Sequence, residues 1–305
     1  MPSDRKTAIG LAFAVSAYVL WGFLPLYFNT LSPAGAIEVV AWRVVLSLAF
    51  CALLLTITRG WAALWVIVRD RRTMLIMGAA GVFILVNWLV YVFAALSGHI
   101  VEASLGYFTN PIVTVLLGVI VLRERLRPLQ WTAIGLSAVA VLVLAVNYGQ
   151  FPWIALALAF SFGLYGFIKK QVGGRVDAVS GLTIETAWLA PLAVVALVVI
   201  TLQGELVMGT AGPTHTVLLL LAGVITAVPL LLFAAAARRL PLTALGFTQY
   251  FAPIIQFLIG VFLFHEEMPL ARWIGFALVW IALVLLAIDV LRSNRAARRA
   301  APEPI

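Results

Sequence analysis

The sequence has few charged residues for its length. Only 10% of its 305 residues are Asp, Glu, Lys or Arg, whereas 64% are hydrophobic and the mean hydropathy is +1.11. Soluble globular domains are about one quarter charged, so this composition excludes a pair of soluble domains, which the length alone would allow. The apolar residues occur in runs of about 18 or more, enough to cross roughly 30 Å of hydrocarbon. The sequence therefore predicts an all-α polytopic membrane protein.

Motifs for several kinds of chemistry are also missing. The single cysteine, Cys51, lies within an apolar run and is interpreted as a small packing residue. His99, His215 and His265 lie apart without metal-ligand spacing, so we predict no metal site and no cofactor. No G-x-x-x-x-G-K-[ST] run is present, which excludes a P-loop ATPase as the driving force. No Ser/His/Asp or Cys/His set is recognisable, so we predict that the protein is not an enzyme.

The apolar runs divide the chain into predicted membrane spans. The first run is not a cleaved signal peptide, because it is too long, contains Trp21 and Pro25, and is followed by no small-residue cleavage site. We predict ten spans, at about 7–28, 35–58, 73–96, 101–122, 130–147, 152–169, 178–201, 214–236, 241–264 and 270–290.

The basic residues alternate from one connection to the next. All of the 20 Lys and Arg residues except Arg43 and Arg272 fall in the termini and in every second connection. The positive-inside rule then predicts that both termini are cytoplasmic and that the number of spans is even. The net charge of +8 marks these cytoplasmic segments and does not indicate nucleic-acid binding. The basic tail 292–305 is interpreted mainly as a topology signal, with contact to lipid headgroups as the alternative.

The fourth and ninth predicted spans resemble each other at a fixed offset. Pro111 corresponds to Pro253, Gly118 to Gly260, Glu124 to Glu266 and Trp131 to Trp273. Because five is an odd number of spans, a second copy of five would enter the membrane from the opposite face. We therefore predict two inverted five-helix repeats, 1–149 and 150–291, which are typical of secondary transporters with a substrate site near the midplane. A duplication that serves folding or assembly alone is the alternative.

Polar side chains recur on single faces of the predicted spans. Asn87 and Tyr91 are four residues apart, Tyr107, Asn110 and Thr114 follow helical spacing, and Gln249 and Gln256 are seven apart. Amides and phenols on such faces suit a small polar or zwitterionic solute with an aromatic or apolar part, although helix–helix hydrogen bonding is the alternative. The candidate substrate-binding residues are Tyr18, Trp21, Arg43, Asn87, Tyr91, Tyr107, Asn110, Tyr165, Gln249 and Gln256.

Arg43 is the most informative single residue. It lies about 12 Å deep in its predicted span at about 1.5 Å per residue. A central arginine costs about 2.5–3.5 kcal/mol on insertion scales. Glu38 is in the same helix at a poor spacing, and Glu102 begins another span on the same side. Three roles stay open: binding a substrate carboxylate, gating the external mouth by pairing with Glu38 or Glu102, and a structural ion pair.

Two further groups of residues could support transport. Pro111 and Pro253 lie inside predicted spans, where a proline frees a carbonyl and kinks the helix, so they are candidate hinges. Glu38 and Glu185 correspond between the repeats, and a buried carboxylate can carry a proton. Together with Glu102 they are the candidates for gating or proton coupling, and a proton is the candidate coupling ion.

The chain contains six further motifs: N-W-L-V-Y (Asn87–Tyr91), E-A-S-L-G-Y-F-T-N-P (Glu102–Pro111), R-E-R-L-R-P-L-Q-W (Arg123–Trp131), T-A-V-P-L-L-L-F (Thr226–Phe233), L-G-F-T-Q-Y-F-A-P (Leu245–Pro253) and F-H-E-E (Phe264–Glu267). In these motifs the chain resembles the RarD-type permeases, in the EamA branch of the drug/metabolite transporter superfamily. The resemblance covers nearly the whole chain and implies ten helices in two inverted repeats, a central cavity and cytoplasmic termini. It also implies that amino acids, drugs or related metabolites are moved, commonly outward, and that the fifth and tenth helices could form a homodimer.

One departure from the family pattern lies beside Arg43. The pattern has His-Arg where this chain has Trp42-Arg43, so a step that depends on that histidine would be missing. We expect a secondary transporter of the bacterial inner membrane that exports a small molecule by alternating access. A non-transporting membrane scaffold or sensor is the alternative, and it gains nothing from the cost of a buried arginine.

Overall fold

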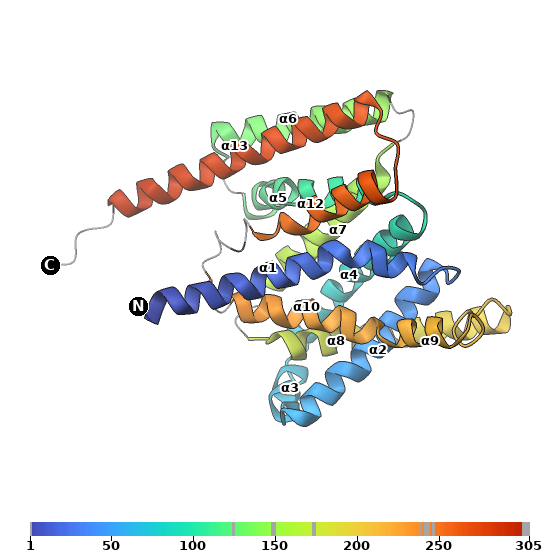
Figure 1. Ribbon diagram of the computed structural model, residues 1–305. Helices are drawn as coiled ribbons and strands as arrows, with labels where there is room; N and C mark the ends of the chain where they lie inside the picture. Colours follow the sequence, from blue (N-terminus) through green and yellow to red (C-terminus); the bar gives the residue numbers. More distant parts are fainter. Residues whose placement is uncertain are drawn as a thin grey trace.

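The computed structural model describes residues 2–123, 126–147, 151–172, 175–237, 239–240, 245 and 248–300 (Figure 1). Within these ranges all regular secondary structure is helical. Glu124, which the sequence pairs with Glu266, and the last five residues of the basic tail lie outside the described residues. The helices are α1 (Pro2–Asn29), α2 (Ala36–Ile57), α3 (Trp61–Val68), α4 (Arg71–Leu96), α5 (Ile100–Leu122), α6 (Pro128–Asn147), α7 (Trp153–Lys170), α8 (Ala178–Leu202), α9 (Pro213–Leu220), α10 (Ala222–Ala237), α12 (Phe251–Leu258), the π-helical turn η1 (Ile259–Leu263) and α13 (Leu270–Ala300).

The length and hydropathy of these helices confirm a polytopic helical membrane protein. Eight helical stretches of the described chain are long and apolar enough to cross a membrane, counting α9 and α10 together as Pro213–Ala236. Two shorter apolar stretches, Trp153–Lys169 and Phe251–Leu263, fall where the sixth and ninth spans are predicted. Their side chains alternate between the protein core and a surface that is largely apolar, as lipid contact requires.

The structure differs from the predicted spans in four places. The short helix α3 lies in a connection where no helix was predicted, and the eighth span divides into α9 and α10 at Leu221. Helix α13 continues to Ala300, although a separate tail was predicted from residue 292. Pro253 is the third residue of α12 and lies in its first turn, where a missing N–H costs no helical hydrogen bond. Pro253 is therefore poorly placed as a mid-helix hinge, whereas Pro111 lies inside α5.

Local sequence explains where several helices begin and end. The side chains of Asp70 and Asp177 cap α4 and α8 by accepting hydrogen bonds from backbone N–H groups of their first turns. A tight turn joins α4 and α5, where the predicted spans 73–96 and 101–122 leave four residues. Gly98 adopts φ +73°, a left-handed conformation that favours glycine, and His99 N–H donates to the carbonyl of Ala94 at 2.9 Å.

The helices form a main bundle with a pair of helices beside it. Helices α1, α2, α4, α5, α7, α8, α9 and α10 share one large buried cluster. Helices α6 and α13 pack along each other and share a second cluster with α5 and α12. Figure 1 shows α6 and α13 together along the upper edge, away from α2 and α3. The main bundle is therefore where polar side chains from many helices meet.

Candidate functional site

Arg43 is buried in the main bundle, on α2. Its side chain contacts three other helices: Nε donates to Thr226 Oγ1 of α10 at 2.7 Å, and the guanidinium carbon lies 4.2 Å from the ring centre of Trp88 on α4. The ring of Phe28, on α1, is 5.6 Å away. These contacts stabilise a cation through stacking and one hydrogen bond. Nη1 is buried and has no hydrogen-bond partner, so a donor remains free at the centre of the bundle.

Three phenols surround this guanidinium. Tyr27, Tyr91 and Tyr107 are close enough to interact electrostatically with Arg43. Tyr27 donates to the carbonyl of Leu218 at 2.9 Å, and Tyr107 donates to Asn87 Oδ1 at 3.0 Å. The hydroxyl of Tyr91 is buried without a partner. The site therefore presents two unused polar groups, Arg43 Nη1 and Tyr91 Oη, against aromatic walls.

An unbroken series of aromatic rings leads from Arg43 to α7. Tyr91 lies 5.9 Å from Phe28 and 5.5 Å from Tyr107, measured between ring centres. Tyr107 lies 5.9 Å from Phe162, which lies 6.0 Å from Tyr165. Because the rings come from α1, α4, α5 and α7, a shift of one of these helices would change the packing of its neighbours.

Asn87 connects α4, α5 and α7. Its amide nitrogen donates to the carbonyl of Leu158 at 3.3 Å and to Ser161 Oγ at 3.1 Å, while its oxygen accepts from Tyr107. All of these groups lie in the bundle interior, where an unpaired amide is costly. Asn87 thus holds Tyr107 beside the arginine.

Three further predicted residues, Tyr18, Trp21 and Gln256, form a second group, which lies nearer the start of α1 than Phe28 does. Tyr18 and Trp21 pack on each other at 5.2 Å and on Phe233 of α10 at 6.0 and 5.9 Å. Gln256 donates to the carbonyl of Trp21 at 3.2 Å, and its own oxygen is buried without a partner. These residues contact one another and are separate from the aromatic series beside Arg43.

Asn110 and Gln249 join neither group through the contacts that the structure shows. The side-chain oxygen of Asn110 is buried without a partner and faces Gly163 of α7. Gln249 lies beside Tyr250, just before α12. Tyr250 lines an apolar groove of about 490 Å³ at the α5–α12–α13 surface.

Neither Glu38 nor Glu102 pairs with Arg43 in the described structure. Glu38 accepts hydrogen bonds from the N–H groups of Val207 and Met208, at 2.8 to 3.1 Å. Glu102 accepts from Ile154 at 3.1 Å and Ala155 at 3.4 Å, at the start of α7. Both carboxylates therefore hold backbone segments in place. Glu102 binds the start of α7, where free N–H groups attract anions, and Glu38 binds the connection after α8.

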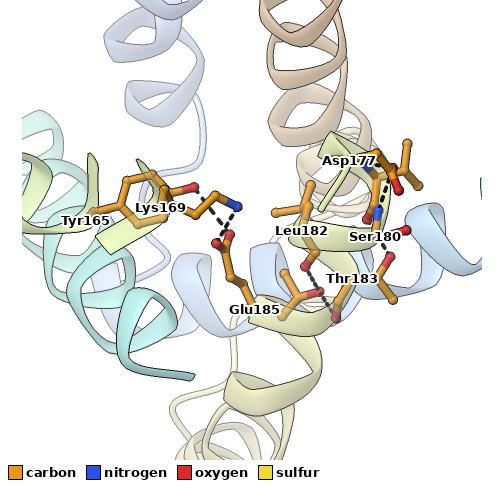
Figure 2. A network of polar contacts seen from close by, with 9 residues as sticks. Tyr165, Lys169, Asp177, Ser180, Leu182, Thr183 and Glu185 are labelled. Atoms are coloured by element: carbon orange, nitrogen blue, oxygen red, sulfur yellow. Dashed lines mark hydrogen bonds and ion pairs between the residues drawn. The ribbon is translucent and has the colours of Figure 1, made fainter. Parts of the chain in front are cut away.

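Glu185 has a different kind of partner. Its Oε1 accepts from Lys169 Nζ at 2.8 Å, and its Oε2 accepts from the Tyr165 hydroxyl at 3.3 Å (Figure 2). The two partners are four residues apart on α7 and so present the same face to α8. The structure thus brings the predicted residues Tyr165 and Glu185 together and adds Lys169, which the sequence did not single out.

Several residues of the site were missed from sequence. Trp88, Phe28 and Thr226 all contact Arg43, yet each lies in an apolar span where its residue type is unremarkable. Lys169 counted only as a topology charge at the end of a span. One signal was available in the sequence. Lys169 follows Tyr165 by four residues, so both side chains lie on the same face of α7. Among the described residues no group of three or more His, Cys, Asp or Glu side chains could hold a metal ion.

Comparison with known proteins places this architecture in a family. The profile of the EamA-like transporter family matches residues 8–146. A solved structure, described as a crystal structure of a protein, has a TM-score of 0.60 and 20% identity over 93% of this chain and 98% of its own, which shows a shared fold.

Three curated relatives align over almost the full length. Protein RarD of Streptomyces exfoliatus is 45% identical over 98% of this chain and 94% of its own. An uncharacterized transporter of Bacillus subtilis, YojE, is 39% identical over 96% and 98%. The chloramphenicol-sensitive protein RarD of Pseudomonas aeruginosa is 31% identical over 95% and 97%. The chain therefore belongs to the EamA-like transporter family, as a RarD-type permease.

Proposed function

We propose that this permease is a secondary carrier of the bacterial inner membrane that exports a small metabolite, amino acid or drug by alternating access, and that Arg43 binds an anionic group of the substrate. The observation that carries the proposal is the buried Arg43 guanidinium with its unpartnered Nη1. A buried charge is costly unless it is paired, and it is retained inside membrane proteins mainly for function. A substrate carboxylate at Nη1 would supply the missing partner.

The engagement of the nearby carboxylates supports a substrate role over a gating ion pair. Glu38 and Glu102 are both satisfied by backbone N–H groups, so each would have to leave several hydrogen bonds in order to reach Arg43. A mobile solute has no such competing partner. The cation therefore favours a ligand over either glutamate.

The walls of the site indicate the rest of the solute. Trp88, Phe28, Tyr91 and Tyr107 present aromatic surface, and Tyr91 adds an unpartnered hydroxyl. Aromatic rings pack well against another ring or an apolar chain, with the hydroxyl available to a polar substituent. We therefore expect a small carboxylate with an aromatic or apolar part.

The packing of the helices supports a carrier with two equivalent halves. The two halves are compared by pairing their helices in order: α1 with α7, α2 with α8, α4 with α9–α10, α5 with α12–η1, and α6 with α13. When each helix is replaced by its counterpart, each major helix–helix contact becomes another contact that the structure shows. The pair α5–α7 becomes α12–α1, α4–α7 becomes α10–α1, α4–α8 becomes α10–α2, and the pairs α2–α8 and α6–α13 are unchanged. Arg43 and Thr226 come from different halves, so their hydrogen bond lies where alternating access would require movement.

The arrangement of the chain ends supports an even number of crossings. In Figure 1, α1 begins and α13 ends on the same side of the molecule. Together with the basic connections, this arrangement favours cytoplasmic termini. Export is the proposed direction, by similarity to the family.

A ligand-binding experiment tests the site. Purified protein in detergent is screened by thermal shift against amino acids, small aromatic carboxylates and chloramphenicol, which carries no carboxylate. We expect carboxylates to raise the unfolding temperature of the wild type and to have no effect on Arg43→Gln. Arg272→Gln is the matched control, because Arg272 is also largely buried but lies at the start of α13.

The outcomes separate the candidate functions. A carboxylate that stabilises wild type and Arg43→Gln equally would remove Arg43 from the site. Stabilisation by chloramphenicol alone would contradict an anionic substrate. The absence of any stabilising compound, with wild-type stability retained in Arg43→Gln, would favour a membrane scaffold or sensor.

A further inference from the structure

We propose that Glu185, Lys169 and Tyr165 form the proton-binding site of the carrier, here called the Glu185 cluster, and that proton binding at Glu185 releases α7 from α8. This inference rests on the proposed carrier function and extends it to the coupling ion. It would make the driving force a proton that enters beside Lys169, at the end of α7.

The partner of Glu185 is able to move, unlike those of the other glutamates described above. Glu38, Glu102 and Glu266 accept hydrogen bonds from backbone N–H groups, which are fixed by the helix or turn that contains them. Glu185 is bound by the end of a long lysine side chain. The Glu185 side chain is 2% exposed and the Lys169 side chain 28% exposed, so the lysine is the member of the pair that reaches the protein surface.

The surface of α8 is shaped around this ammonium group. A Cβ at Gly181 would lie 2.9 Å from Lys169 Nζ, so a larger residue at this position would displace the lysine. Gly181 precedes Glu185 by one helical turn and lies on the same face. Figure 2 shows Lys169 and Tyr165 converging on Glu185 from α7. The space left by the missing side chain of Gly181, here called the Gly181 notch, and the Glu185 carboxylate together form the binding site of the ammonium group.

Proton binding changes the balance of this contact. Ionised Glu185 needs Lys169, because an unpaired buried carboxylate is strongly unfavourable. A proton that enters from the side of Lys169 and binds Oε1 leaves a neutral acid, which the Tyr165 oxygen can still contact. Lys169 stays protonated and moves into water. The end of α7 then loses its ionic contact with α8.

The charged and titratable groups around Glu185 are few among the described residues. Helix α7 contributes Lys169 and Tyr165, and α8 itself contributes Asp177, whose carboxylate is used in capping. Helix α4 faces Glu185 with Gly81, the sequence of α10 has no titratable side chain, and α2 contributes Cys51, beside Thr183. Lys169 is thus the cation that opposes the charge of Glu185.

The cluster is connected to the proposed substrate site. Tyr165 begins the series of rings that runs through Phe162, Tyr107 and Tyr91 to Phe28 beside Arg43. Asn87 ties the same part of α7 to Tyr107. Release of α7 would therefore loosen the walls that hold the substrate, which is the connection that a coupled carrier requires.

The single cysteine provides a native reporter. Cys51 is 1% exposed and contacts Thr183, two residues before Glu185. Its reaction with N-ethylmaleimide, followed by intact mass in proteoliposomes, reports whether α8 moves away from α2 once its ionic contact with α7 is lost. The labelling rate of Cys51 in wild type is divided by its rate in Glu185→Gln at the same pH. The variant imitates protonated Glu185. The ratio also cancels the ordinary pH dependence of the thiol reaction.

We expect this ratio to be near one at about pH 5.5 and to fall about tenfold by about pH 8. If Glu185 ionises within this range, its protonated fraction falls by about tenfold per pH unit once the group is mostly ionised. Tyr165→Phe should shift the midpoint to higher pH, because it removes a hydrogen bond to the ionised form. The same ratio measured with Glu102→Gln in place of Glu185→Gln is the control and should not follow this curve.

A ratio that does not vary with pH would overturn the proton site, as would an equal curve for the Glu102→Gln control. If Glu185→Gln folds poorly, Gly181→Ala tests the same contact by displacing Lys169, and it should label faster than wild type at about pH 8. The Arg43-dependent thermal shift is measured on the same preparations. A constant ratio with a normal shift defeats the proton site alone, whereas a pH-dependent ratio with no ligand shift defeats the Arg43 site alone.

Discussion

Glu38 and Glu185 lie on two helices that pack against each other, α2 and α8, yet their carboxylates have different kinds of hydrogen-bond partner. Glu38 on α2 binds the backbone N–H groups of Val207 and Met208 in the connection after α8. Glu185 on α8 binds the Lys169 side chain and a phenol. Backbone donors cannot leave without deforming the chain, whereas a lysine only rotates. One end of the α2–α8 pair is therefore fixed, and the other can respond to a proton.

The largest effect should come from removing the movable cation. Lys169→Met leaves the Glu185 carboxylate buried without a counterion, and we expect a loss of about 3 kcal/mol in the free energy of unfolding near neutral pH. Acidification should recover most of this loss, because the proton removes the stranded charge. Thermal unfolding in detergent between about pH 5 and about pH 8 measures both. Equal destabilisation at both ends of that range would argue against an ionised Glu185.

The second largest effect should come from replacing each glutamate by glutamine, and the loss of stability should differ between the two positions. Glu38→Gln places an amide NH₂ among backbone N–H donors, and we expect a loss of about 2 kcal/mol. Glu185→Gln frees a lysine that can reach water, so its loss should be about 1 kcal/mol or less. Parallel melting curves of the two variants provide the measurement. A larger loss for Glu185→Gln than for Glu38→Gln would reverse the assignment of the fixed and movable ends.

A smaller change tests the binding site of the ammonium group. Gly181→Ala should weaken the Lys169–Glu185 contact by steric displacement, at a net cost of about 1 kcal/mol after the helix-propensity gain of alanine. Gly135→Ala is the control, because a Cβ there meets nothing within 4 Å. We expect this control to be neutral or slightly stabilising. Similar melting temperatures for the two variants would show that the Gly181 notch is unimportant.

The smallest effect should come from the cap of α8, which is independent of the Glu185 cluster. Burial acts to raise the pKa of Asp177, but hydrogen bonds from Ser180 and Val179 outweigh it and hold the pKa below its ordinary value. The cap therefore adds stability above the pKa of the unfolded chain and loses it as the pH falls through the folded pKa. Asp177→Ala should cost about 0.5 kcal/mol near neutral pH. A pH series of melting temperatures checks this, and a difference that persists at strongly acidic pH would contradict it.

Sequence reasoning was most reliable where one residue type has one strong preference. Long apolar runs had to be buried in lipid or protein, so most of the helices could be placed within a few residues. The predicted spans left only four residues between α4 and α5, and the positive φ of Gly98 shows how so short a connection turns. Helix α3 was missed because its eight residues are too few to cross a membrane, although they are as apolar as a span.

Partners distant in the chain could not be predicted in the same way. Arg43 was recognised because a charge inside a span is costly, but its hydrogen bond to Thr226 joins residues 183 positions apart. Glu38 and Glu102 were expected near Arg43, and their actual partners are backbone groups that no side-chain pattern reveals. The partner of a carboxylate depends on how the helices pack in three dimensions. The periodicity of the sequence alone does not predict that partner.

The hydrogen bond between Arg43 Nε and Thr226 has a consequence for pharmacology. A guanidinium can be approached along two edges, and in this structure Thr226 occupies Nε while Nη1 is free. A molecule that binds Nη1 alone leaves the hydrogen bond between α2 and α10 in place. A carboxylate that binds Nη1 first and then turns onto the edge formed by Nε and Nη2 must displace Thr226 and separate the two helices. The first kind of molecule would act as an inhibitor that holds the carrier in one state, and the second as a cargo that sets it in motion.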